Sequence, residues 1–172
     1  MQSSIKVLNS TPSDIDTIFE FYNLAIEHQK KVSPKQWQGF DRDLVKQEIA
    51  YGRQYKILVD GNVAAIFAIT YSDPQIWLGK GHDAAVYIHR IVTHPEYRGY
   101  GFVKVIIDWA KEYSKTKPLD YIRIDTWADN ERLLKYYTGC GFNHVGEIKI
   151  APNSGLPKHY DGITLNLFEI KL

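Results

Sequence analysis

The chain has 172 residues, of which 44% are hydrophobic and 24% charged, a composition typical of a globular protein. Its 21 lysines and arginines are balanced by 20 acidic residues, so the net charge of +1 provides no general attraction to a phosphate polymer. Cys140 is the only cysteine, so no intrachain disulfide can form, and the sequence has neither a signal-peptide core nor a run of roughly 18 apolar residues. We expect a cytoplasmic protein with a single domain over residues 1–172 and no membrane partner.

The first half of the chain predicts a strand, two helices and a β-hairpin. Apolar residues recur at helical spacing in two segments, and Pro12 and Asp14 are favourable in the first turn of the first helix. The sequence Asp60-Gly61-Asn62 between two β-rich runs is a strong hairpin signal. The expected ranges are residues 5–8 for the strand, 12 to about 30 and 41–51 for the helices, and 55–59 and 63–72 for the hairpin strands.

The second half predicts a strand–helix–strand unit followed by a short helix and two closing strands. The expected ranges are a loop over 72–83, strands at 84–93 and 121–127, helices at 102–116 and 128–141, and closing strands at 142–150 and 163–172. The order predicts an α/β fold with a mixed (α+β) sheet, in which antiparallel N-terminal strands precede one central crossover.

The stretch RGYGFVKV, from Arg98 to Val105, is compatible with two different structures. As a strand it nearly matches the ribonucleoprotein signature of RNA-recognition domains, with Val105 in place of an aromatic residue. Residues 86–91 resemble the companion signature, but only six residues separate this run from Arg98, too few to connect two parallel strands. Helical periodicity also continues past Val103, so we expect no nucleic-acid partner.

The other structure is a loop that leads into a helix. Gly99 and Gly101 let the backbone turn closely, and free N–H groups at the start of a helix can bind a pyrophosphate with support from the helix dipole. The pattern is not the dinucleotide fingerprint, because Lys104 stands where that motif has its third glycine, and no Walker Gly-Lys-Ser/Thr follows. The loop therefore predicts a phosphate-bearing cofactor.

Two motifs make the chain resemble the GCN5-related N-acetyltransferase (GNAT) superfamily, over about residues 84–145. Its acyl-CoA loop has Arg or Gln, two residues, Gly, one residue, and Gly or Ala; the matching residues are Arg98, Gly99, Tyr100, Gly101, Phe102 and Val103. The second motif is Asn130, then Tyr137 seven residues on, then Gly141-Phe142. Val103 departs from the usual Gly or Ala, so its side chain must point away from a bound cofactor or shift it.

The resemblance implies direct transfer of an acetyl group from acetyl-CoA to an amine. The backbone of Ile91, Val92 and Thr93 would pair with the pantetheine arm, and residues 98–103 would hold the pyrophosphate with Arg98 as a supporting cation. Asn130 would hydrogen-bond the cofactor or cap its helix. Tyr137 would protonate the leaving thiolate.

The group that removes the proton from the amine stays open. Asp125 lies near the end of the central strand, His89 on the preceding strand and Glu147 on the following one. His89 has a near-neutral intrinsic pKa, which suits a base, whereas Asp125 suits the binding of a cationic substrate. Relay through water would need no residue at all, and we take Asp125 or His89 as the candidates.

Structural roles compete with several of these assignments. Asn130 is a favourable helix N-cap, and one of the neighbours Tyr136 and Tyr137 is expected in the core because adjacent helical residues face different directions. Cys140 is expected to be structural, since a helix C-terminus disfavours a thiolate. We expect no metal, because metal-ligand spacing is lacking at His82, His144 and His159.

We therefore expect an N-acetyltransferase that uses acetyl-CoA as cosubstrate and a small-molecule or peptide primary amine as acceptor. The alternative from another functional class is a catalytically silent acyl-CoA-binding or sensing protein with the same fold. The acceptor stays open among polyamines, amino acids, aminoglycoside-like drugs, peptide N-termini and protein lysines, because acceptor residues come from variable loops. The terminal strands can also support a homodimer.

Overall fold

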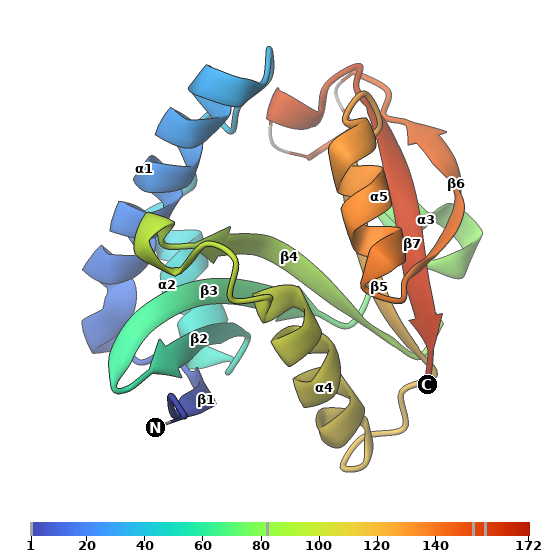
Figure 1. The fold of residues 1–172 in the computed structure, drawn as a ribbon. Coiled ribbons are helices and arrows are strands. Elements are labelled where there is room, and N and C mark those ends of the chain that lie inside the picture. The colour runs from blue at the N-terminus through green and yellow to red at the C-terminus, as the bar shows by residue number, and fades with distance from the viewer. Residues whose placement is uncertain (1, 82, 153, 157) are drawn as a thin grey trace. The chain divides into compact units, whose positions relative to one another are not determined.

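The computed structural model describes residues 2–81, 83–152, 154–156 and 158–172 (Figure 1). The strands form a seven-stranded sheet in the order β1-β2-β3-β4-β5-β7-β6, with antiparallel and parallel pairs, which confirms the predicted mixed fold. Two compact units divide the chain: residues up to 69 with 90–102, and residues 70–89 with 103–172. His82, one of the histidines considered above, lies outside the described residues.

The strands of the first unit are antiparallel neighbours. They are β1 (Ile5–Asn9), β2 (Gln54–Val59) and β3 (Asn62–Thr70), paired in that order. Between β2 and β3, Asp60 and Gly61 both have positive φ, 49° and 86°, which a two-residue type I′ turn requires. The hairpin predicted from Asp60-Gly61-Asn62 is therefore confirmed.

Two helices supply most of the core of this unit, α1 (Ile15–Val32) and α2 (Arg42–Ala50). The side chain of Asp41 accepts a hydrogen bond from the backbone N–H of Asp43 at 2.9 Å, which explains why α2 begins at Arg42. Apolar residues at helical spacing face inward and pack with residues of β3 and β4. The core residues are Ile18, Phe21, Tyr22, Val45, Ile49, Ile66 and Val92.

The predicted crossover is present as β4 (Ala85–Thr93), α4 (Phe102–Ser114) and β5 (Tyr121–Trp127). β4 and β5 are parallel, and their pairing runs from Ala85↔Tyr121 to Tyr87↔Arg123. The backbone of β4 from Ile88 onward thus extends past this paired segment. No helix within the described ranges is both long and apolar enough to cross a membrane.

The closing elements of the second unit are α5 (Glu131–Gly139), β6 (Asn143–Lys149) and β7 (Thr164–Lys171). β7 lies between β5 and β6 and is antiparallel to both, so the last strand of the chain is interior to the sheet and β6 is at its edge. In Figure 1 α5 runs alongside β7, and the ring of Tyr137 on α5 contacts that of Phe168 on β7 at 5.7 Å.

One predicted loop is wrong. The segment 72–83 contains a short helix, α3 (Pro74–Trp77), followed by a 3₁₀ turn, Leu78–Lys80. Pro74 stands at the first helical position, where its missing N–H is tolerated, and Ile76 and Trp77 are buried in the core of the second unit. The burial of these two side chains stabilises a helix that is too short for periodicity to show.

Candidate active site

The cofactor loop predicted from RGYGFV has the backbone that its glycines suggest. Gly99 and Gly101 both have positive φ, 89° and 74°, and apart from the glycine and its two chain neighbours no heavy atom lies within 4 Å of a Cβ placed at either residue. The glycines are therefore required by conformation and not by crowding within the chain. Since α4 begins at Phe102, the N–H groups of its first turn have no intrahelical acceptor and are available to an anion.

The side chains of this loop differ in exposure. Arg98 is exposed and Tyr100 is 48% exposed, whereas Phe102 is only 3% exposed and forms a stacked pair with Tyr100 at 5.6 Å. Val103 is 6% exposed. Its β-branched side chain lies in the protein interior, so the residue that departs from the family pattern retains its backbone N–H without presenting its side chain to solvent.

The strand that precedes the loop carries the residues predicted to pair with pantetheine. Val92 belongs to the core of the first unit, while its neighbours Ile91 and Thr93 are half-buried. Alternation along the strand thus turns Ile91 and Thr93 to the face opposite Val92.

Arg90, just before these residues, has a left-handed backbone with φ 51°. This conformation costs a residue with a side chain about 1–2 kcal/mol. The guanidinium forms an ion pair with Glu48 and lies 5.1 Å from the ring centroid of Phe40 and 5.7 Å from that of Tyr22. These contacts of a largely buried side chain offset the strain in β4.

Asn130 caps α5. Its side-chain oxygen accepts a hydrogen bond from the backbone N–H of Leu133 at 3.1 Å. Of the two roles expected for Asn130, the structure contains the capping one, and it also explains why α5 begins at Glu131 and not at the predicted residue 128. Contact with the cofactor stays a prediction.

Tyr137 is the buried member of the tyrosine pair on α5. It is 8% exposed, against 46% for Tyr136, and its ring also contacts Phe142 and Phe168. Burial, with smaller contributions from Tyr136, Cys140 and Asp125, raises the pKa of the Tyr137 phenol above its ordinary value. The phenol therefore stays protonated at neutral pH and can act as a proton donor.

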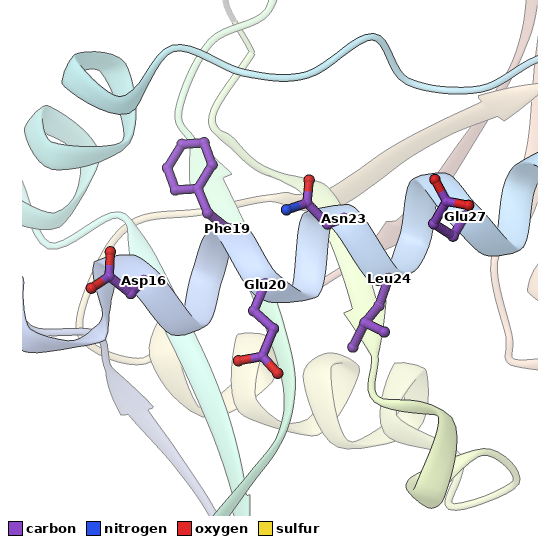
Figure 2. A pocket seen from close by; sticks show the side chains of 6 residues that line it. All are labelled: Asp16, Phe19, Glu20, Asn23, Leu24 and Glu27. Atoms are coloured by element: carbon purple, nitrogen blue, oxygen red, sulfur yellow. The ribbon is translucent and has the colours of Figure 1, made fainter.

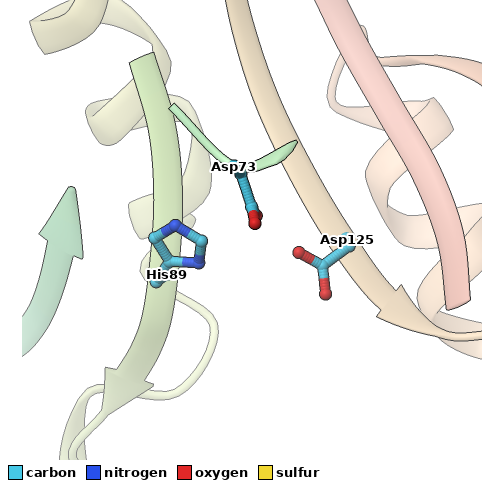
Figure 3. A group of neighbouring side chains, drawn as sticks. All are labelled: Asp73, His89 and Asp125. Atoms are coloured by element: carbon cyan, nitrogen blue, oxygen red, sulfur yellow. The ribbon is translucent and has the colours of Figure 1, made fainter. Parts of the chain in front are cut away.

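Asp125 and His89, the two candidates for proton removal, lie close together in the second unit, and Asp73 joins them. Each residue offers one ligand atom, and these three atoms all lie within 4.8 Å of one another. Figure 3 shows the carboxylates of Asp73 and Asp125 directed toward one another, with the imidazole of His89 beside them. Glu147, considered with these candidates, is an exposed residue of β6 and is not part of the group.

The electrostatics of this group are unusual for carboxyls. Burial raises the pKa of Asp73 to about 6, and burial together with the charge of Asp73 raises the pKa of Asp125 to about 7. His89 Nε2 lies 2.9 Å from the hydroxyl of Thr70, which orients the imidazole ring. The group therefore combines two carboxyls that titrate near neutrality with an oriented imidazole.

Two features position Asp73. Its backbone N–H donates to the carbonyl of Gly81 at 3.2 Å, and a Cβ at Gly81 would lie 2.3 Å from the Cα of Pro74. Gly81 thus allows the segment on both sides of α3 to close tightly. Nothing in the sequence around Asp73 marks it as functional, because an Asp before Pro is equally typical of a helix start.

A separate hollow lies on α1 and has a volume of about 390 Å³ (Figure 2). All of its lining residues come from one face of that single helix, so the hollow is shallow and cannot surround a ligand. They are Asp16, Phe19, Glu20, Asn23, Leu24 and Glu27. None of the predicted site residues lines it.

Comparison with known proteins gives the family. The sequence profile described as the acetyltransferase (GNAT) family matches residues 17–142, well over half of the chain. The chain belongs to this family. Acetyl-CoA is the cosubstrate of GNAT acetyltransferases, so the cofactor expectation is confirmed at the level of the family.

A curated GNAT relative and two solved structures extend the match. An uncharacterized N-acetyltransferase, YesJ of Bacillus subtilis, is 24% identical over 119 residues, covering 64% of this chain and 66% of YesJ, just under two thirds of that relative's length. A GNAT acetyltransferase from Listeria monocytogenes has a TM-score of 0.78 at 22% identity and covers 100% of this chain and 99% of its own. The putative acetyltransferase yncA of Salmonella typhimurium, solved with acetyl-CoA, has a TM-score of 0.67 at 13% identity, covering 98% and 94%. At these identities the structures show that the GNAT fold is shared.

Proposed function

We propose that the protein is an N-acetyltransferase that transfers the acetyl group of acetyl-CoA directly to a primary amine. The observation that carries the proposal is the buried, protonated phenol of Tyr137, at the position where the family motif has its acid, in the same unit as His89 and Asp125. A protein that only bound acyl-CoA would not need these groups together.

The cofactor would be held by residues of the loop and of β4. The N–H groups at the start of α4, reached through Gly99 and Gly101, suit the pyrophosphate, and exposed Arg98 adds a positive charge. The backbone of Ile91-Val92-Thr93 suits pairing with the amides of pantetheine as an added strand. The buried side chain of Val103 is consistent with this arrangement, since only its backbone would face the ligand.

The chemistry balances with one proton released. The acceptor arrives as an ammonium and loses a proton to His89, and the lone pair of the resulting amine forms a bond to the acetyl carbonyl carbon. The C–S bond then breaks, Tyr137 protonates the leaving thiolate, and the second proton lost by the nitrogen restores the phenol. The net reaction converts an ammonium and acetyl-CoA into an acetamide, CoA and one proton.

The discriminating experiment is Tyr137→Phe, with Tyr136→Phe as matched control. We expect acetyl transfer, measured as CoA thiol release across an amine panel, to fall about 10²- to 10⁴-fold for Tyr137→Phe with unchanged acetyl-CoA affinity. The exposed Tyr136 should tolerate the same change. Acetyl-CoA binding by the unaltered protein without turnover of any amine would favour the silent binding protein instead.

A further inference from the structure

Asp73 and Asp125 place two carboxyls side by side, and the group that joins them among the described residues is the imidazole of His89. Among the described residues, neither Asp73 nor Asp125 forms an ion pair. Arg123, two residues before Asp125 on β5, is fully buried, but its guanidinium is already bonded to Asp83 at 2.8 Å and Glu169 at 3.0 Å. An ammonium ligand would supply the cationic partner that Asp73 and Asp125 lack in the ion pairs of the described residues.

Asp73 is directed into this group without a partner for one of its oxygens. The residue is only 9% exposed, and its Oδ2 accepts no hydrogen bond from the described residues. An unpaired buried carboxylate oxygen is unfavourable by about 1–3 kcal/mol, so it calls for a partner such as a bound water, an ion or a ligand. Figure 3 shows that this carboxylate points toward Asp125 and the side of β4 that carries His89.

We propose that Asp73, Asp125 and His89 form a three-point cradle for the ammonium group of a primary amine acceptor. An ammonium has three N–H donors, and acceptor atoms bound at about 2.8–2.9 Å around a tetrahedral nitrogen lie about 4.6–4.7 Å apart. The three ligand atoms here all lie within 4.8 Å of one another, so one such nitrogen can reach them in the tautomer that leaves the His89 nitrogen among them unprotonated. The inference rests on the proposed acetyl transfer and adds to it the role of Asp73 in binding the acceptor as its ammonium form.

The cradle predicts selectivity at the nitrogen. A primary ammonium satisfies all three acceptors, an N-methylated secondary ammonium leaves one unpaired, and a quaternary ammonium donates no hydrogen bond. Each buried acceptor left unpaired weakens binding, and Asp73 would decide this preference because its Oδ2 accepts no hydrogen bond from the described residues. Acceptors would therefore be alkyl primary amines that are protonated in solution.

The first test measures binding without catalysis. The imidazole signal of His89, assigned by its loss in His89→Gln, is followed by NMR at pH 8, where the carboxyls are ionised and an alkyl amine is protonated. We expect n-butylammonium to shift this signal saturably, butyltrimethylammonium to leave it unchanged, and Asp73→Asn to weaken the n-butylammonium affinity roughly 10- to 100-fold. Asp108→Asn, at an exposed carboxylate of α4, is the matched control and should bind normally.

The second test uses turnover with n-butylamine and N-methylbutylamine. Asp73→Asn should raise KM for n-butylamine while leaving acetyl-CoA affinity unchanged, and the primary amine should be preferred. Equal use of both amines, an unchanged KM, or a His89 signal that responds to Zn²⁺ but not to n-butylammonium would overturn the cradle. Normal n-butylammonium binding without acetyl transfer would overturn the proposed function and leave the cradle standing.

Discussion

The left-handed backbone of Arg90 predicts that glycine stabilises the protein more than alanine at this position, the reverse of the order at an ordinary strand position. At an ordinary strand position, replacement by Gly leaves a protein about 0.5–1 kcal/mol less stable than replacement by Ala. At Arg90, where φ is 51°, Ala keeps the left-handed strain of about 1–2 kcal/mol and Gly does not. We therefore expect Arg90→Gly to be more stable than Arg90→Ala by up to about 1.5 kcal/mol. Both variants lose the ion pair with Glu48 and the ring contacts equally.

The assay is urea unfolding of four variants followed by tryptophan fluorescence. Lys6, an exposed residue of β1 in the same unit, supplies the control pair Lys6→Ala and Lys6→Gly, in which Ala should be the more stable. Subtracting the control difference isolates the backbone strain at Arg90, about 1–2 kcal/mol. With a slope of about 2 kcal/mol per molar urea, that is a midpoint difference of about 0.5–1 M. If the stability difference between the Ala and Gly variants is the same at Arg90 as at Lys6, the backbone at Arg90 carries no left-handed strain.

Further predictions concern the loop, Tyr137 and Asp125. Gly101→Ala should weaken CoA binding about 5- to 30-fold by calorimetry, because φ 74° strains any other residue by about 1–2 kcal/mol, whereas Gly79→Ala, with ordinary φ, should bind normally. Tyr137→Phe should reduce turnover and spare cofactor affinity, as described above. Because burial raises the folded-state pKa of Asp125, the folded protein binds more protons than the unfolded chain. Stability should therefore fall as pH rises from about 4 to about 7, and Asp125→Asn should flatten that fall.

Each of the predictions for Gly101, Tyr137 and Asp125 has a result that would contradict it. Equal CoA affinity for Gly101→Ala and the unaltered protein would show that the loop can adopt another backbone. An unchanged rate in Tyr137→Phe would remove the phenol from the reaction. A free energy of unfolding that falls equally steeply between pH 4 and 7 in Asp125→Asn would assign the pH dependence to other groups.

Local patterns in the sequence are sufficient to predict most of the helices and strands. The turn residues Asp60-Gly61 predicted the hairpin because positive φ at two successive positions demands such residues. The helical period after Gly101 predicted α4, and the same period excluded an RNA-binding strand. The helix α3 was missed because four residues are too few for a period and its stability comes from the burial of Ile76 and Trp77.

Only those residues of the candidate site that belong to a single sequence motif could be predicted from the sequence. The motif spacing predicts Tyr137 and not Tyr136 as the functional tyrosine, and the structure places Tyr137 in the interior. Asp73 was not predictable, because its meeting with Asp125 depends on contacts between segments about fifty residues apart in the sequence. The sequence does not predict the position of β7 between β5 and β6 either, because strand order depends on long-range pairing and not on local sequence.

That strand order has a consequence for how the protein is made. β7 follows every other described strand in the sequence, yet β6 joins the sheet only through it. During synthesis, the edges of β5 and β6 that pair with β7 stay unpaired until residues 164–171 have left the ribosome. All residues of the predicted chemistry have been translated by then. A nascent protein without residues 164–171 would thus have all of its reactive groups and an incomplete sheet.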